Sequence, residues 1–95
     1  MRKYETVFII RPDMDEAATN AVIEKITSVI TENGGTLDNS NIWGLRKLAY
    51  LIEDYAEGFY VVFNFSSELN VIDALEYNFK VSDSILRHII VRDGE

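Results

Sequence analysis

The chain has 95 residues, of which 47% are hydrophobic and 26% are charged, and its net charge at pH 7 is −7. This balance is that of a soluble globular protein and excludes a disordered tail, while the length leaves room for one hydrophobic core. There is no cysteine, which excludes disulfides and sulfur-ligated zinc. Apolar runs such as 7–10 and 59–63 are far shorter than the roughly 20 residues of a membrane span. We therefore expect a single cytoplasmic domain over 1–95 that does not enter a membrane.

The charged residues are unevenly distributed along the chain. Three stretches that we predict to form strands, 1–12, 36–52 and 81–92, contain seven Lys and Arg residues and three Asp and Glu residues. The remainder contains two basic and thirteen acidic residues. Polyanion-binding proteins usually carry a basic excess, but this segregation allows an acidic protein to present a basic surface.

The first third of the chain predicts a strand followed by a helix. Residues 3–10 are rich in β-branched and aromatic side chains, which favours a strand. Asp13 with Glu16 fits a capping box at the start of a helix, and Asp15 is the competing cap. Asn-Gly-Gly at 33–35 ends this helix, because glycine readily adopts the left-handed conformation. Its apolar positions recur at helical spacing: Ala18, Val22, Ile26, Val29 and Ile30.

The middle of the chain predicts a β-hairpin. A long strand begins near Thr36 and ends at about Ile52, and Gly44 within it indicates a bulge or bend. Residues 53–58, of which three are acidic, form the turn. Residues 59–65 are the most strongly apolar strand of the chain, which indicates a central position in its sheet.

A second helix and a last strand complete the chain. Ser66, Ser67 and Asn70 offer N-caps for the helix, and residues 83–84 turn the chain into a strand over 85–92. The helix has apolar residues at helical spacing, namely Val71, Ile72, Leu75 and Phe79.

The order strand, helix, strand, strand, helix, strand is typical of the α+β ferredoxin-like fold. In this βαββαβ arrangement, two helices cover one face of a four-stranded antiparallel sheet. Right-handed crossovers place the first and third strands in the middle of the sheet and the second and fourth at its edges. The uncovered, partly aromatic face is a candidate binding surface, although the fold alone does not name the ligand.

The residues do not favour an enzyme. The single histidine, His88, lies in a predicted strand, where a packed side chain is the more common role, and no nucleophile pairs with it. Asp13, Asp15 and Glu16 are explained by helix capping rather than by metal binding. The loop 11–15 would repel a phosphate because it contains two carboxylates. We expect no catalytic residue, metal, cofactor or small-molecule substrate.

Basic and aromatic residues interleave in the predicted strands. Arginine and lysine neutralise phosphates, and aromatic rings stack on unpaired bases. The alternative interpretation is that the charges protect edge strands from aggregation and that the aromatic residues form the core. The residues alone weigh RNA binding and this alternative about equally.

Two segments resemble the bacterial ribosomal protein S6 family. These are residues 2–5 (Arg-Lys-Tyr-Glu) and residues 44–52 (Gly-Leu-Arg-Lys-Leu-Ala-Tyr-Leu-Ile), and the resemblance extends over the whole chain. Leu51 departs from the pattern, since the family is expected to have proline there. The resemblance implies a structural component of the small ribosomal subunit. Its partners would be the central domain of small-subunit ribosomal RNA and the small basic ribosomal protein S18.

The resemblance also indicates which residues meet RNA. The expected RNA-binding residues are Arg2, Lys3, Tyr4, Arg46, Lys47, Arg87 and Arg92. Weaker candidates, for RNA or for the protein partner, are Tyr50, Tyr60 and Ile89. Two other functions stay open at this point: a small dimeric ligand-binding or regulatory ferredoxin-like domain, and a small phosphate-handling enzyme.

Overall fold

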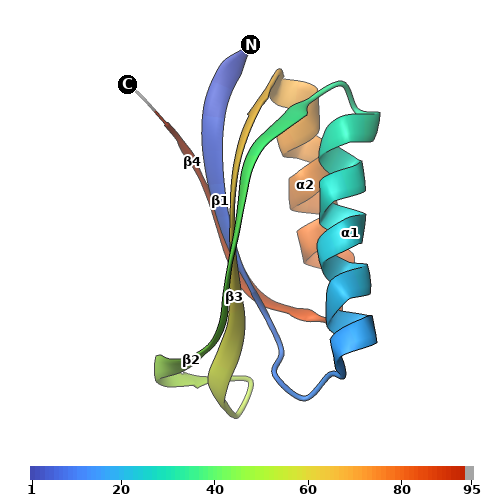
Figure 1. Ribbon diagram of the computed structural model, residues 1–95. Coiled ribbons are helices and arrows are strands. Elements are labelled where there is room, and N and C mark those ends of the chain that lie inside the picture. Colours follow the sequence, from blue (N-terminus) through green and yellow to red (C-terminus); the bar gives the residue numbers. More distant parts are fainter. Residues whose placement is uncertain (94–95) are drawn as a thin grey trace.

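Two helices lie side by side on one face of a four-stranded antiparallel sheet (Figure 1). The structure, a computed structural model, describes residues 1–93. Its elements are β1 (Arg2–Ile10), α1 (Glu16–Glu32), β2 (Thr36–Ile52), β3 (Tyr55–Ser67), α2 (Leu69–Val81) and β4 (Ile85–Arg92). The strand order is β2-β3-β1-β4, so the first and third strands are central. The predicted ferredoxin-like fold is confirmed.

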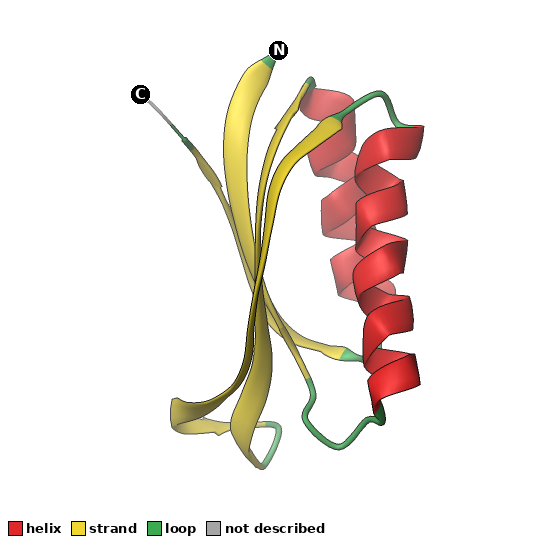
Figure 2. Cartoon of the chain, in the orientation of Figure 1, coloured by secondary structure: helices red, strands yellow, loops and turns green. Residues whose placement is uncertain are grey.

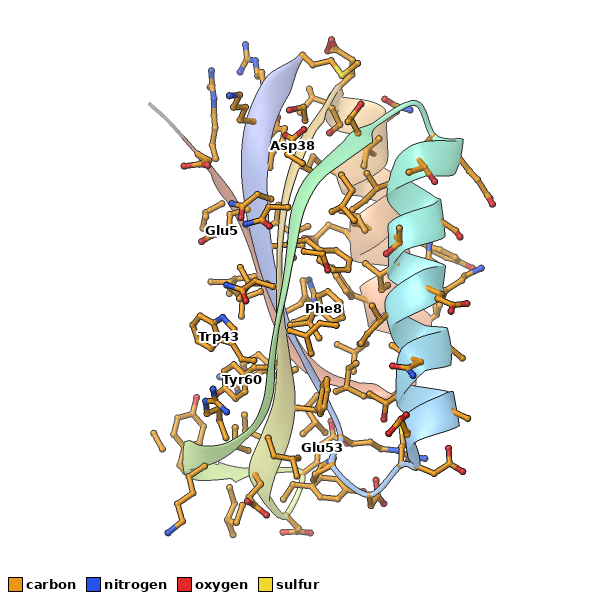
Figure 3. All side chains as sticks on the ribbon, viewed as in Figure 1. Glu5, Phe8, Asp38, Trp43, Glu53 and Tyr60 are labelled. Atoms are coloured by element: carbon orange, nitrogen blue, oxygen red, sulfur yellow. The ribbon has the colours of Figure 1, made fainter. Side chains whose placement is uncertain are left out.

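The hydrophobic core lies between the sheet and the helices, and alternate residues of the central strands form its floor. In β1, the buried residues Tyr4, Thr6, Phe8 and Ile10 face the helices. The ring of Phe8, which Figure 3 shows on this side of the sheet, packs edge-on against Phe63 of β3 at a centroid distance of 5.3 Å. It contacts Phe79 of α2 at the same centroid distance. These contacts join both central strands to α2 through one buried ring.

The predicted helix caps are partly wrong. Asp15 caps α1, because its Oδ1 accepts a hydrogen bond of 2.8 Å from the amide of Ala18, and Asp13 lies outside the helix. The cap of α2 is Glu68, which makes no side-chain capping bond. Ser66 and Ser67 were predicted as caps but belong to β3, which continues to residue 67 before the chain leaves the sheet.

The buried side of α1 differs slightly from the predicted apolar stripe. Ala18 and Val22 are only half-buried, and the adjacent Thr19 and Ile23 are buried in their place. Ile26, Val29 and Ile30 are buried as predicted. The stripe is therefore rotated toward Thr19 in the first turns, where the helix packs above the sheet.

The hairpin turn is much shorter than predicted. It consists of Glu53 and Asp54 alone, with left-handed φ angles of 50° and 71°, and β3 begins at Tyr55 directly after it. A two-residue turn with positive φ at both positions matches the twist of the flanking strands. Asparagine and glycine usually occupy such turns, so the residues Glu53 and Asp54 did not indicate a two-residue turn in the sequence.

β2 is irregular where it approaches the turn. The predicted bulge at Gly44 is confirmed by its φ of +81° and by a register shift between Ile42 and Gly44. A larger shift separates Lys47 from Ile52, so that residues 48–51 have no regular partners in β3. Figure 1 shows this end of β2 bending away from the helices, toward the open face. We call residues 46–58 the hairpin tip.

Gly58 allows the hairpin tip to lie closely against β1. A Cβ atom at this position would be 2.2 Å from Cγ2 of Ile9, a distance that no side chain tolerates. Ile9 is buried although it faces away from the helices. The absence of a side chain at residue 58 therefore leaves room for the Ile9 side chain on the open side of the sheet.

We expect Gly58→Ala to lower the free energy of unfolding by about 1–3 kcal/mol, the usual cost of overpacking. Chemical denaturation would measure this. In the double variant Gly58→Ala, Ile9→Ala, the loss should be smaller than the sum of the two single losses, because the second change removes the clashing atom. Strictly additive losses would show that the contact with Ile9 is not the cause.

A side-chain hydrogen bond connects the hairpin with the loop between β1 and α1. The hydroxyl of Tyr55 donates to Oδ2 of Asp13 at 2.9 Å. This bond, together with the negative charge of Asp13, raises the pKa of the Tyr55 phenol above its usual range. The bond requires the protonated phenol, so its contribution to stability is present below the phenol's unfolded pKa and is lost as the pH rises through the higher folded value.

We expect Asp13→Ala to lower the pKa of Tyr55 toward its usual value, because the variant loses both the hydrogen bond to the carboxylate and its negative charge. The measurement is the tyrosinate absorbance during an alkaline titration, taken as the difference between each protein and its Tyr55→Phe counterpart. An unchanged titration of Tyr55 would contradict the assigned hydrogen bond.

Candidate nucleic-acid interface

The sheet face opposite the helices is uncovered in the described chain (Figure 2). Alternation along the strands determines which residues lie there. β1 contributes Lys3, Glu5, Val7 and Ile9, whose partners in β3 are Ser66, Asn64, Val62 and Tyr60. β4 contributes Arg87, Ile89 and Val91, which pair with Ile9, Val7 and Glu5. We call this surface the open face.

Two aromatic rings stack on the open face. The rings of Trp43 in β2 and Tyr60 in β3 have centroids 6.1 Å apart and planes inclined by 12°. Figure 3 shows both on the side away from the helices, opposite Phe8. Trp43 is 45% exposed, so another planar group can still stack on its ring. It lies at the bulge beside Gly44, which adds a residue to β2 at this point.

Tyr50 and Arg87 form a second aromatic contact, between the two edge strands. Nη1 of Arg87 donates to the Tyr50 hydroxyl at 2.5 Å, and the guanidinium carbon lies 5.4 Å from the centre of the same ring. β2 and β4 are separated by two strands. The irregular segment 48–51 must therefore reach over the open face for this contact to form.

The predicted basic residues fall into two groups at opposite ends of β1. Arg92 pairs with Tyr4, and the amide of Asp93 donates to the carbonyl of Lys3 at 2.9 Å, which brings Arg2, Lys3 and Arg92 to one end. Arg87 lies opposite Ile9 at the other end, where Arg46 pairs with Gly58. We call the first group the terminal basic group. Arg46 and Arg87, with Trp43, Tyr50 and Tyr60, form the aromatic–arginine surface.

Not all predicted residues reach the open face. Arg46 lies there, whereas Lys47 alternates to the other side and pairs with Glu57. Arg2 and Arg92 have the strand positions of the helix side, as the partners of Ser67 and Tyr4, although both are exposed. Alternation therefore separates the two adjacent basic residues of β2.

Tyr4 does not belong to the exposed site. Only 7% of its surface is accessible, and its ring stacks on Phe65 within the core at a centroid distance of 5.6 Å. The buried ring therefore offers no face on which a base could stack, and any other RNA contact of Tyr4 stays a prediction. Trp43 was not among the predicted site residues, yet it is the exposed member of the aromatic pair. The available signal was that Trp43 is one of the aromatic residues that interleave with the basic ones in the predicted strands.

The two ends of the open face differ electrostatically. Near Lys3, a shallow depression also contains Asp38 and Asp93, and Glu5 accepts a hydrogen bond from Asn64 at 3.2 Å. The aromatic–arginine surface contains two guanidinium groups and no carboxylate among its five members. The three carboxylates of the hairpin tip, Glu53, Asp54 and Glu57, lie in or near the turn and are not members of this surface.

His88 has a packing role on the helix side. Its ring stacks on Phe79 with a centroid distance of 4.5 Å, and Nε2 is 3.3 Å from a carboxylate oxygen of Glu76. Within residues 1–93, no three acidic or histidine side chains are grouped so that they could hold a metal ion. None of the described helices is long and apolar enough to span a membrane.

Comparisons with known proteins agree with the sequence resemblance. A family model described as Ribosomal protein S6 matches residues 3–92. The small ribosomal subunit protein bS6 of Clostridium acetobutylicum is 48% identical over 91 residues, which cover 96% of each chain. The bS6 protein of Thermoanaerobacter pseudethanolicus is 45% identical over 95 residues and the full length of both chains.

A solved structure has the same architecture. The crystal structure of 30S ribosomal protein S6 from Thermotoga maritima superimposes with a TM-score of 0.92 at 33% sequence identity, covering 96% of this chain and 86% of that one. Proteins of this family are structural and not catalytic, and they are part of the ribosome in the cytoplasm. The family model, the relatives and the fold lead to one conclusion: the chain belongs to the ribosomal protein S6 family and is a protein of the small ribosomal subunit.

Proposed function

We propose that this protein binds the central domain of small-subunit ribosomal RNA together with ribosomal protein S18. The observation that carries this proposal is the aromatic–arginine surface on the open face. Arg46 and Arg87 lie there beside the stacked pair of Trp43 and Tyr60. Cationic groups combined with exposed rings are what single-stranded segments of RNA require.

The two kinds of side chain have different tasks in this proposal. The guanidinium groups of Arg46 and Arg87 neutralise backbone phosphates and release their counterions. The exposed ring of Trp43 offers a platform for an unstacked base. Tyr50 holds the guanidinium of Arg87 from one side by the contact already described, so this arginine is oriented before RNA arrives.

The terminal basic group extends the proposed surface along β1 and β4. Arg87 and Arg92 are five residues apart in β4, which corresponds to about 17 Å of strand. A phosphate backbone that follows this edge of the sheet would meet Arg87 first and then Arg92 with Arg2 and Lys3. The nearby Asp38 and Asp93 reduce the positive potential at Lys3, so we assign the terminal group the weaker share of the attraction.

The proposed role of S18 follows from the charge on the helices. Their exposed side contains five acidic residues and only two basic ones, Lys25 and Lys80. The acidic residues of α1 and α2 are Glu16, Glu24, Glu32, Asp73 and Glu76. A small basic partner would offset this negative field, which otherwise opposes the approach of RNA. We therefore expect weak RNA binding by the protein alone.

Family membership also decides between the functions that the sequence left open. A protein of the small ribosomal subunit is neither a regulatory module nor an enzyme. The loop after β1 supports this, since Arg11 makes its ion pair there with Asp13, at 3.4 Å. Because Arg11 is already paired with a carboxylate, it is less able to bind a phosphate.

We expect the double variant Arg46→Ala, Arg87→Ala to weaken binding to a central-domain RNA fragment in the presence of S18. The slope of log K against log salt should become less steep by roughly 0.7–0.9 for each phosphate that the variant no longer neutralises. Titrations at several salt concentrations, with and without S18, would measure both effects. Binding by the wild-type protein should be tight only when S18 is present.

The matched control is the variant Lys25→Ala, Lys80→Ala, which removes the same charge from the exposed side of the helices. With S18 in saturating excess, so that a change in partner affinity does not enter the measurement, this variant should leave the salt slope unchanged. Equal slopes for the two double variants would exclude the aromatic–arginine surface as the site of phosphate contact. Absence of wild-type binding under every condition would exclude RNA binding itself.

We expect Trp43→Ala to weaken the same interaction by about 1–3 kcal/mol, the usual contribution of one stacked base. The salt slope should not change, because no charge is removed. The control is Tyr77→Ala, which removes an exposed ring from α2 and should have no effect. An affinity equal to that of the wild type would show that Trp43 stacks on Tyr60 only.

A further inference from the structure

Helix α1 ends on an Asn-Gly pair that the proposed function does not use. Asn33 is the residue that caps the end of the helix, and Gly34 follows it with a left-handed φ of 91°. Both residues are exposed. A Cβ atom at Gly34 would have no atom within 4 Å. The peptide bond between the two residues is therefore accessible to water and has free space around it.

An Asn-Gly pair can react with itself, and asparagine is among the chemically labile residues. The amide nitrogen of Gly34 attacks Cγ of Asn33, and the side-chain NH2 group leaves as ammonia with the proton of the attacking nitrogen. Glycine favours this step because it has no side chain to hinder the approach. Water then opens the five-membered succinimide ring. Opening at Cγ gives aspartate, whereas opening at the main-chain carbonyl gives isoaspartate, in which the backbone passes through Cβ and Cγ.

The fold holds both reacting groups in hydrogen bonds. The Gly34 amide donates to the carbonyl of Thr31 at 3.2 Å, and the next amide donates to the carbonyl of Ile30 at 2.8 Å. These are the two bonds of a Schellman motif. Nδ2 of Asn33 donates to the carbonyl of Val29 at 2.7 Å. The ring can close only after the attacking nitrogen and the side-chain amide have both left these partners.

A further hydrogen bond connects the reacting peptide group with the second helix. Nδ2 of Asn70, in the first turn of α2, donates to the carbonyl oxygen of Asn33 at 2.8 Å. Figure 1 shows the end of α1 beside the start of α2. The carbonyl of Asn33 and the nitrogen of Gly34 belong to one planar peptide group. A bond that fixes the oxygen therefore also restrains the rotation that would bring the nitrogen to Cγ.

We propose that Asn33–Gly34 is a site of spontaneous deamidation and that the hydrogen bond from Asn70 controls its rate. The reaction takes place in the fraction of molecules in which the last turn of α1 has opened, since helix ends open locally more readily than the whole fold. This proposal does not depend on RNA binding, because the pair lies at the end of a helix and is not part of the aromatic–arginine surface.

Both products weaken the junction between the helices. A carboxylate in place of the amide puts a negative charge at the negative end of the α1 dipole, and it cannot donate to Val29 as the amide does. In isoaspartate the backbone gains a methylene group, which displaces the carbonyl that accepts the bond from Asn70. The next residue has little room to adjust, because even a Cβ atom at Gly35 would be 2.9 Å from the carbonyl oxygen of Ile30.

The site is tested by incubating the folded protein in warm neutral buffer and analysing its tryptic peptide 26–46 by mass spectrometry. This peptide also contains Asn39 and Asn41, which serve as internal comparisons. Fragmentation should place the first conversion of an amide to an acid at Asn33, and labelling by an isoaspartyl methyltransferase should detect isoaspartate there. Conversion first at Asn39 or Asn41, or none at Asn33, would overturn the proposal.

Asn70→Ala tests the control by the fold. This variant should deamidate at Asn33 several-fold faster than the wild type, because the peptide group rotates more freely. The matched control is Asn78→Ala, which removes from α2 a bond of the same kind, from Nδ2 of Asn78 to the carbonyl of Ala74 at 2.8 Å. It should deamidate at the wild-type rate. Circular dichroism would establish that both variants are folded.

The same measurement in urea separates the contribution of the fold from that of the Asn-Gly sequence. Once the chain is unfolded, the wild type and both variants should deamidate at Asn33 at one common rate, faster than the folded wild type. Equal rates for folded Asn70→Ala and Asn78→Ala would overturn the control by Asn70. A wild type that reacts no faster in urea than in the folded state would do the same.

Discussion

The uninterrupted antiparallel pairing of β1 with β3 determines the side of the sheet on which other side chains lie. The register extends from Arg2 opposite Ser67 to Ile10 opposite Phe59. It places Phe8, Phe63 and Phe65 together beneath the helices, where each is fully buried. A shift by one residue would move these rings to the open face and bring charged residues into the core. Burial of the aromatic residues therefore also exposes Arg87 and the adjacent surface.

The same register explains how an acidic protein can carry a local basic surface. Acidic residues occupy the exposed side of α1 and α2, whereas the hairpin end of the open face contains Arg46 and Arg87 without a carboxylate in the aromatic–arginine surface. The sheet lies between the two regions. Net charge is thus a poor guide to the local field, since the potential at a surface depends on nearby groups and falls off within about 10 Å at moderate salt.

The long hairpin combines several locally unfavourable features. Glu53 and Asp54 both adopt left-handed conformations, and residues 48–51 leave the regular ladder. Gly58 lies against Ile9, where no side chain would fit. Together these features bend the hairpin tip over the open face, so that Tyr50 reaches Arg87 across the sheet. Local strain of this kind persists only when surrounding contacts maintain it.

Much of the fold could be predicted from the residues, and much less of the site could. Period-2 and helical patterns, the glycines at 34 and 35, and the order of the elements sufficed for six elements and a sheet with β1 and β3 at its centre, because these are local or topological properties. The ends of β3 and the caps of both helices were less well predicted, since Glu-Asp at the turn and Ser66–Ser67 have more than one compatible conformation.

Only the tertiary structure decided which predicted residues share a surface. It buried Tyr4, separated Arg46 from Lys47, stacked Trp43 on Tyr60 and brought Tyr50 to Arg87. Each of these outcomes depends on strand register or on a bulge, and a single residue of difference reverses the face of a side chain. The sequence by itself determined the elements, their order and the family of the protein. The composition of its surfaces required the three-dimensional pairing of strands that are distant in the chain.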